Sequence, residues 1–103
     1  MLIVRSRNGV PVRLTEERWQ HILRRHPEMV DQRERILETI AEPDMIQEGD
    51  FGEMLAVRFY PETPITRKYL MVAFREIGQE DGFVLTAYLT NQPSPRREVI
   101  WKR

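Results

Sequence analysis

The sequence contains no cysteine, carries no net charge and has no long apolar run. Without cysteine there is no disulfide framework, no thiolate ligand for a metal ion and no cysteine nucleophile. No stretch approaches the length of a membrane-spanning helix, and the apolar start at residues 1–4 is interrupted by Arg5 and Arg7. We therefore expect a cytoplasmic domain without a secretory signal or a membrane segment.

The charge balance limits the classes of partner. Sixteen basic residues offset sixteen acidic residues, and most of the basic ones are arginines. Domains that bind nucleic acid are usually basic overall, so this balance counts against non-specific binding but leaves a local basic face open. The planar guanidinium matches phosphate geometry, although the simpler interpretation is that most arginines are solubilising partners of the acids.

Glycine and histidine are also scarce. The five glycines form no phosphate-binding loop, no dinucleotide fingerprint and no nucleophile elbow. The two histidines are His21 and His26. On a continuous helix this spacing separates them by about 140°, whereas the histidine pair of a zinc helix shares one face at a spacing of four. We therefore expect no metal site and no cofactor.

The N-terminal third predicts a hairpin followed by two helices. A turn signal at Asn8-Gly9 separates two short extended segments, residues 1–5 and 10–14. Thr15 is suited to cap a first helix, which Pro27 should end near residue 26. A second helix is predicted over residues 31–41, where Asp31 and Glu34 match a capping box.

Beyond the helices the apolar residues recur at every second position, which predicts β-strands. The predicted strands are residues 54–60, 68–76, 83–90 and 98–102, separated by segments rich in turn residues. The 103 residues are long enough for one domain, residues 1–103. We expect the α+β class, with the N-terminal helices packed on one face of an antiparallel sheet of about four strands.

Alternation assigns the side chains of these strands to two sheet faces. We place the more apolar set under the helices: Leu55, Val57, Phe59, Leu70, Val72, Phe74, Phe83, Leu85, Ala87 and Leu89. The opposite face then carries a polar and aromatic set: Arg58, Tyr60, Tyr69, Met71, Arg75, Thr86, Tyr88 and Thr90. Such a face is either an ordinary solvated sheet surface or a platform for a ligand with phosphate groups, and the pattern leaves both open.

The residue types that remain for chemistry are histidine, arginine, lysine and hydroxyls. His26 lies on the apolar stripe of the first helix, which is typical of a capping or core residue. His21 is flanked by Arg18, Arg24 and Arg25, whose charges favour a neutral imidazole that can act as a general base. This set suits RNA cleavage, because the 2′-OH supplies the nucleophile and the protein needs only a base, an acid and cations.

Three stretches resemble parts of a known family of domains. Residues 14–29, LTEERWQHILRRHPEM, resemble a motif of small phage- and toxin-associated domains. Residues 83–90, FVLTAYLT, and 99–102, VIWK, look like the closing strands of the same domains. These are the phage-barnase-EndoU-colicin-RelE-like nuclease domains. The resemblance implies helices followed by a four-stranded antiparallel sheet, and metal-independent cleavage of RNA, often tRNA or ribosome-bound RNA.

The resemblance also implies positions for the site. The helix histidine of the motif falls on His21 with His26 as its companion, the basic strand residue on Lys68 or Arg58, and the hydroxyls on the strand of residues 83–90. The expected catalytic residues are His21, His26, Lys68, Thr86 and Tyr88. The expected substrate contacts are Arg58, Tyr60, Arg75 and Thr90. Because Thr86 and Tyr88 should point away from the helices, His21 reaches them only if the helix end passes beyond a sheet edge.

A second hypothesis is a catalytically silent module of the same fold, since fold does not imply function. Tyr69, Met71 and Arg75 would then form a protein interface, in which such residues are enriched. RNA is the expected partner under the first hypothesis, and a protein inhibitor or an antitoxin is a second candidate partner. A homodimer that pairs through the edge strands of residues 1–5 or 98–102 is a further alternative.

Overall fold

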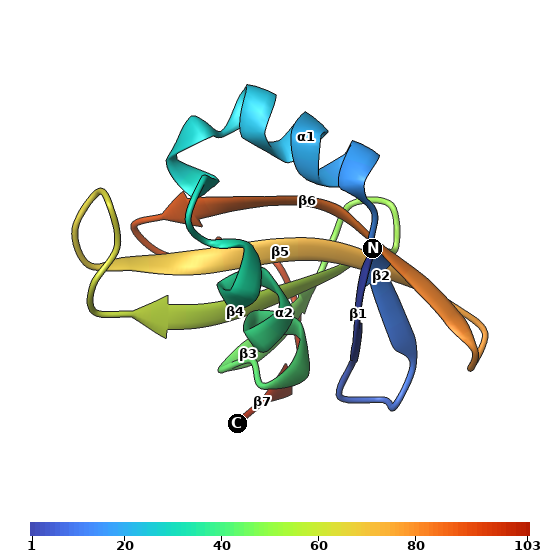
Figure 1. Ribbon diagram of the computed structural model, residues 1–103. Coiled ribbons are helices and arrows are strands. Elements are labelled where there is room, and N and C mark those ends of the chain that lie inside the picture. The colour runs from blue at the N-terminus through green and yellow to red at the C-terminus, as the bar shows by residue number, and fades with distance from the viewer.

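The computed structural model describes all residues from 1 to 103 as two helices packed on one open sheet of seven strands (Figure 1). In chain order the elements are β1 (Leu2–Arg5), β2 (Pro11–Leu14), α1 (Glu16–Arg25), the 3₁₀ turn η1 (Pro27–Met29), α2 (Arg33–Ala41), β3 (Met45–Glu48), β4 (Met54–Tyr60), β5 (Lys68–Ile77), β6 (Asp81–Thr90) and β7 (Val99–Lys102). The α+β prediction is confirmed in this coarse form. Neither helix has the length and apolar character needed to cross a membrane.

The sheet has the strand order β1-β2-β6-β5-β4-β3-β7. Every neighbouring pair is antiparallel except β2 and β6, which run parallel and share the single register pair Arg13–Phe83. The expected number of about four strands is wrong, because the hairpin β1–β2 joins one edge and β3 is an additional strand beside β7. β7 lies at the other edge, so the chain must cross the sheet between β6 and β7.

Local signals place α1 as predicted but not the start of α2. The Thr15 side chain accepts a hydrogen bond from the Arg18 backbone N–H at 3.1 Å, which caps α1. α1 ends at Arg25, before the extended backbone that Pro27 imposes on its predecessor. α2 begins only at Arg33 and has no side-chain cap. The predicted capping box at Asp31 is therefore wrong, since η1 and a turn occupy that position.

The main core lies between the helices and the sheet. Trp19 and Ile22 of α1, Met29 of η1, and Ile36 and Ile40 of α2 are all buried against it. From the sheet, Val12, Leu14, Ala56, Tyr60, Leu70, Val72, Phe74, Val84 and Ala87 complete this cluster. In Figure 1, α1 lies along β6 and α2 lies over the middle of the sheet.

The face assignment is correct for β5 but wrong for β4. Ala56 and Tyr60 are buried under the helices, whereas Leu55 and Val57 are buried on the opposite side, which we call the far face. Arg58 therefore lies on the helix-covered face with Tyr60. The alternation was ambiguous because both sides of β4 are apolar, as befits a strand covered on both faces.

β6 contains an irregularity that inverts its first residues. The register passes from Ala73–Thr86 to Phe74–Val84, so Leu85 is an extra residue on β6. Val84 consequently packs in the main core and Phe83 lies on the far face, opposite to the prediction. Beyond this bulge, Thr86, Tyr88 and Thr90 lie on the far face as predicted, because they pair with far-face positions of β5.

The far face is partly covered by the segment of residues 91–98, which we call the connector. It links β6 to β7 and crosses the sheet on the side away from the helices (Figure 1). The Gln47 side-chain amide donates to the Ser94 carbonyl at 2.7 Å, which holds the connector against β3. Met71 is only 7% exposed, and Leu55 and Val57 are buried beside it. This face is therefore not an open surface.

Candidate functional site

One helix histidine, His26, meets one far-face hydroxyl residue, Tyr88, at the free edge of β6. β2 pairs with β6 only at Phe83, so the rest of this edge of β6 has α1 and η1 beside it instead of a strand (Figure 1). His26 follows the last residue of α1, and its ring centroid lies 5.4 Å from that of Tyr88, with the planes tilted by 31°. The end of the helix thus reaches past the sheet edge, but it is His26, and not His21, that contacts Tyr88.

A carboxylate faces the same histidine. Glu28 Oε2 lies 3.7 Å from His26 Nδ1, and both side chains are partly buried. This distance is too long for a hydrogen bond, so the two side chains form an ion pair only when the imidazole is protonated. The Glu28–His26–Tyr88 group therefore places an imidazole between a carboxylate and a phenol.

His21 lies one turn earlier on α1, on a flank that carries two arginines. Arg18, His21 and Arg25 recur at spacings of three and four, which places them on one side of the helix. The Arg18 guanidinium donates to the Leu85 carbonyl at 3.3 Å, so this flank borders the free edge of β6. The remaining N–H groups of Arg18 make no hydrogen bond within the chain and are available to an anion.

The surroundings of His21 favour its neutral form. Partial burial, followed by the charges of Arg18, Arg25, Arg24 and His26, holds the pKa of His21 below its ordinary value. A lowered pKa keeps the imidazole unprotonated at neutral pH, where it can accept a proton. This agrees with the prediction made from the flanking arginines.

On the far face, Tyr88 also lines a pocket of about 160 Å³. Thr90 and Met71 form its wall with Tyr88, and Gln92, Pro93 and Arg97 of the connector close it. Tyr88 therefore contacts His26 on one side and this pocket on the other. Thr86 lies on the same face two residues earlier, but it does not line the pocket.

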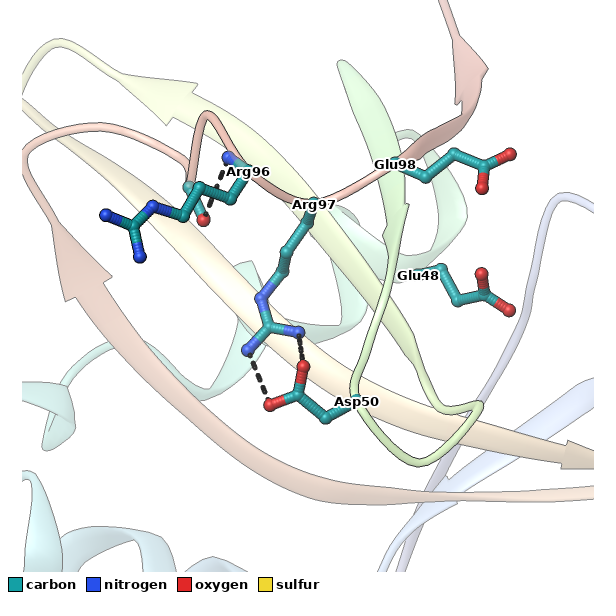
Figure 2. A pocket seen from close by; sticks show the side chains of 6 residues that line it. Glu48, Asp50, Arg96, Arg97 and Glu98 are labelled. Carbon is teal, nitrogen blue, oxygen red and sulfur yellow. Dashed lines mark hydrogen bonds and ion pairs between the residues drawn. The ribbon is translucent and has the colours of Figure 1, made fainter.

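The cation at the rim of this pocket is already paired. Figure 2 shows the Arg97 guanidinium in a two-armed ion pair with Asp50, at 2.9 Å and 3.4 Å. The adjacent larger pocket, about 340 Å³, is lined by the carboxylates of Glu48, Asp50 and Glu98 together with Arg96 and Arg97. Three acids against two arginines do not favour the binding of a phosphate group in this pocket.

Two of the predicted site residues, Arg58 and Tyr60, lie under α2 instead of in this region. Arg58 Nη1 donates to the Glu42 carbonyl at 2.7 Å, and its guanidinium lies 3.8 Å from the carboxylates of Glu38 on α2 and of Glu42, which directly follows α2. Tyr60 is buried, and its hydroxyl donates to Glu38 Oε1 at 2.5 Å. Burial, followed by this hydrogen bond, raises the pKa of Tyr60 to about 12. Both residues thus join α2 to the sheet and are structural.

Lys68 and Arg75 are also displaced from the site. Lys68 pairs with Tyr60 across the sheet, on the helix-covered side, and its ammonium donates to the Asn91 side chain. Arg75 is on the far face as predicted but lies four residues from Met71, about 13 Å along the strand. Its guanidinium donates to the Phe51 carbonyl at 3.0 Å.

The connector and α1 contribute residues to this region that were not among the predicted site residues. Arg18 had a usable signal, because it shares the helical flank of His21. Arg97 had none, since it reaches the far face only through the crossing of the connector, and the contact of Gln47 with Ser94 depends on the same crossing. No group of three or more histidine, aspartate or glutamate side chains is arranged to hold a metal ion. No protein-family model, curated protein or solved structure matches this chain.

Proposed function

We propose that this chain is a metal-independent endoribonuclease of the phage-barnase-EndoU-colicin-RelE-like type. The contact between His26 and Tyr88 supports this most directly, because it joins the histidine-bearing helix to the hydroxyl-bearing sheet face. The order of helices followed by antiparallel strands β3–β6 also agrees with that family's expected fold.

In the proposed reaction, His21 is the general base. Its lowered pKa leaves the imidazole free to take the proton of the 2′-OH, whose oxygen then attacks the adjacent phosphorus. The P–O5′ bond breaks, and a proton donor neutralises the leaving oxygen. His26, which lies 3.7 Å from Glu28 and beside Tyr88, is the proposed donor. The products are a 2′,3′-cyclic phosphate and a 5′-hydroxyl end.

Negative charge grows on the phosphate oxygens during this attack. Cations aimed at those oxygens lower the barrier most when they need no rearrangement. Arg18 and Arg25 share the flank of His21, and Arg18 is held by the Leu85 carbonyl. We assign to Arg18 and Arg25 the cationic role that the resemblance gave to Lys68 or Arg58.

The alternative hypothesis, a protein-binding module, relied on an exposed surface of Tyr69, Met71 and Arg75. Met71 is covered by the connector and Arg75 is bound to the Phe51 carbonyl. These contacts leave the proposed interface smaller than the sequence indicated, and they favour the enzyme.

Cleavage of RNA in EDTA tests the proposal. The purified chain should cut total RNA, tRNA or ribosomal RNA into fragments that end in a 2′,3′-cyclic phosphate. His21→Ala and His26→Ala should each lower the rate by about 10²- to 10⁴-fold, the usual contribution of a positioned base or acid. Tyr88→Phe should lower the rate as well, because its phenol lies beside the proposed donor. Tyr60→Phe is the matched control, because it removes the same hydroxyl from a tyrosine that supports α2.

Two results would count against the enzyme. Folded wild-type chain that leaves all three RNA classes intact over long incubation would favour the binding module. Equal loss of activity in Tyr60→Phe and Tyr88→Phe, with both variants folded, would remove the site from the free edge of β6.

A further inference from the structure

An aromatic pair with an unpartnered arginine lies on the far face beside the candidate site. Phe59 of β4 and Tyr69 of β5 are cross-strand partners, and their ring centroids are 5.1 Å apart at 63°. Both side chains are half-buried. The Arg67 guanidinium lies 5.5 Å from the Phe59 ring centroid, within the range of a cation–π contact.

The charge of Arg67 is not neutralised by the chain. Arg67 is exposed and has neither a hydrogen bond nor an ion pair from its guanidinium. The same face offers a comparison at its other end, where Arg13 lies 5.8 Å from the Phe83 ring centroid but forms an ion pair with Asp81. Only the first of these two aromatic–arginine groups therefore has a cation free to bind an anion.

The pair is also in register with the site. Tyr69 is opposite Thr90, and Met71 is opposite Tyr88, so Tyr69 and Tyr88 are diagonal neighbours on one sheet face. Such positions lie about 7–8 Å apart. Thr90, between them, lines the same pocket as Tyr88. The shortest route from Tyr88 to the aromatic pair therefore runs past Thr90, where the connector begins.

We propose that Phe59, Tyr69 and Arg67 form a stacking subsite for one unpaired nucleobase that flanks the scissile phosphate, with Arg67 contacting the adjoining phosphate. The inference rests on the proposed endoribonuclease function and narrows its substrate to single-stranded RNA. Aromatic rings bind nucleobases of any sequence by stacking, and a guanidinium adds phosphate and cation–π contacts. In a duplex the base faces are already stacked, so a paired nucleotide cannot occupy the subsite.

Binding of a non-cleavable RNA tests the subsite separately from catalysis. A short single-stranded 2′-O-methyl oligonucleotide with a fluorescent end label is titrated with the full chain, and anisotropy is recorded. Tyr69→Leu and Phe59→Leu should weaken binding by about 5- to 100-fold, the range for one lost base–aromatic stack. Tyr69→Phe keeps the ring and should bind like the wild type. Arg67→Gln, on an exposed side chain, should weaken binding and flatten its salt dependence.

Phe83→Leu is the matched control, since it removes a half-buried ring from the same face beneath a paired arginine. It should leave the affinity unchanged. The same oligonucleotide annealed to its complement should bind more weakly than the single strand.

The two proposals fail in different ways. Cleavage by the wild type together with unchanged binding in Tyr69→Leu and Arg67→Gln would overturn the subsite and leave the enzyme standing. Loss of binding in these two variants but not in Phe83→Leu would support the subsite, even for a wild type that cuts no RNA. Equal losses in all the variants, or no binding by the wild type, would overturn the subsite.

Discussion

Tyr60 offers a test of the fold beneath the site, because its pKa is raised from 10.0 to about 12. Burial and the hydrogen bond to Glu38 both favour the protonated phenol in the folded chain. A group with a raised folded pKa contributes stability that is fully present below the unfolded pKa and is lost as the pH rises through the folded pKa. A difference of two pKa units corresponds to about 3 kcal/mol of stability, which is lost between about pH 10 and 12.

The consequence for Tyr60→Phe can be worked out at two pH values. At pH 8 the variant lacks one buried hydrogen bond and should be less stable than the wild type by about 1 kcal/mol. At pH 11 the wild type has lost about 1 kcal/mol of stability, because the unfolded chain ionises Tyr60 more readily than the folded chain, and the variant has lost none of it. The stability difference should therefore close to about zero or reverse sign.

Urea unfolding at a series of pH values measures this difference, with the fluorescence of buried Trp19 as a probe. For a domain of this size 1 kcal/mol moves the urea midpoint by about 1 M or slightly less. Tyr69→Phe is the control, because Tyr69 is half-exposed and its hydroxyl has no partner within the chain. A constant offset between wild type and Tyr60→Phe from pH 8 to pH 11 would refute the reasoning.

Two further predictions concern the site. Arg18→Gln removes the positive charge that lowers the pKa of His21 more than any other charge does. NMR titration should therefore show the pKa of His21 move up towards about 6.5, and the acid limb of the kcat/KM profile should move to higher pH with it. An unmoved titration curve of His21 would contradict the assignment. Arg97→Gln breaks the exposed ion pair with Asp50, so the free energy of unfolding should fall by no more than about 1 kcal/mol. Amide hydrogen exchange in the connector should become faster. Unchanged exchange in the connector would show that the ion pair does not hold it.

Features encoded by neighbouring residues could be predicted from the sequence. Thr15 caps α1 and Pro27 stops it through contacts within a few residues, and both predictions are confirmed. The far-face positions of Tyr88 and Thr90 were also predictable, because they follow a regular alternation along one strand. Each of these rests on local stereochemistry.

Features that depend on distant segments could not be predicted. β4 alternates equally well in either phase, and only the connector, about forty residues further along the chain, decides that Leu55 faces it while Tyr60 faces α2. The bulge at Leu85 inverts Phe83, and neither glycine nor proline stands at the bulge itself, since Gly82 lies three residues before it. Arg58 and Lys68 were predicted to bind the substrate, but the acceptors that they bind come from distant segments. Arg58 binds the end of α2, and Lys68 binds Asn91.

The meeting of His26 with Tyr88 follows from how little of β6 is paired on its outer edge. If β2 continued along β6 beyond Phe83, a strand would occupy the space that α1 and η1 fill, and the helix would be confined to one face. Because β2 leaves after a single register pair, the backbone N–H and C=O groups of this edge are open to side chains, and Arg18 binds one at Leu85. Pro27 then ends α1 where the edge remains free, which brings His26 to the far-face tyrosine. The early end of the β2–β6 pairing and the end of α1 before Pro27 thus combine to bring His26 of the helix to Tyr88 of the far face.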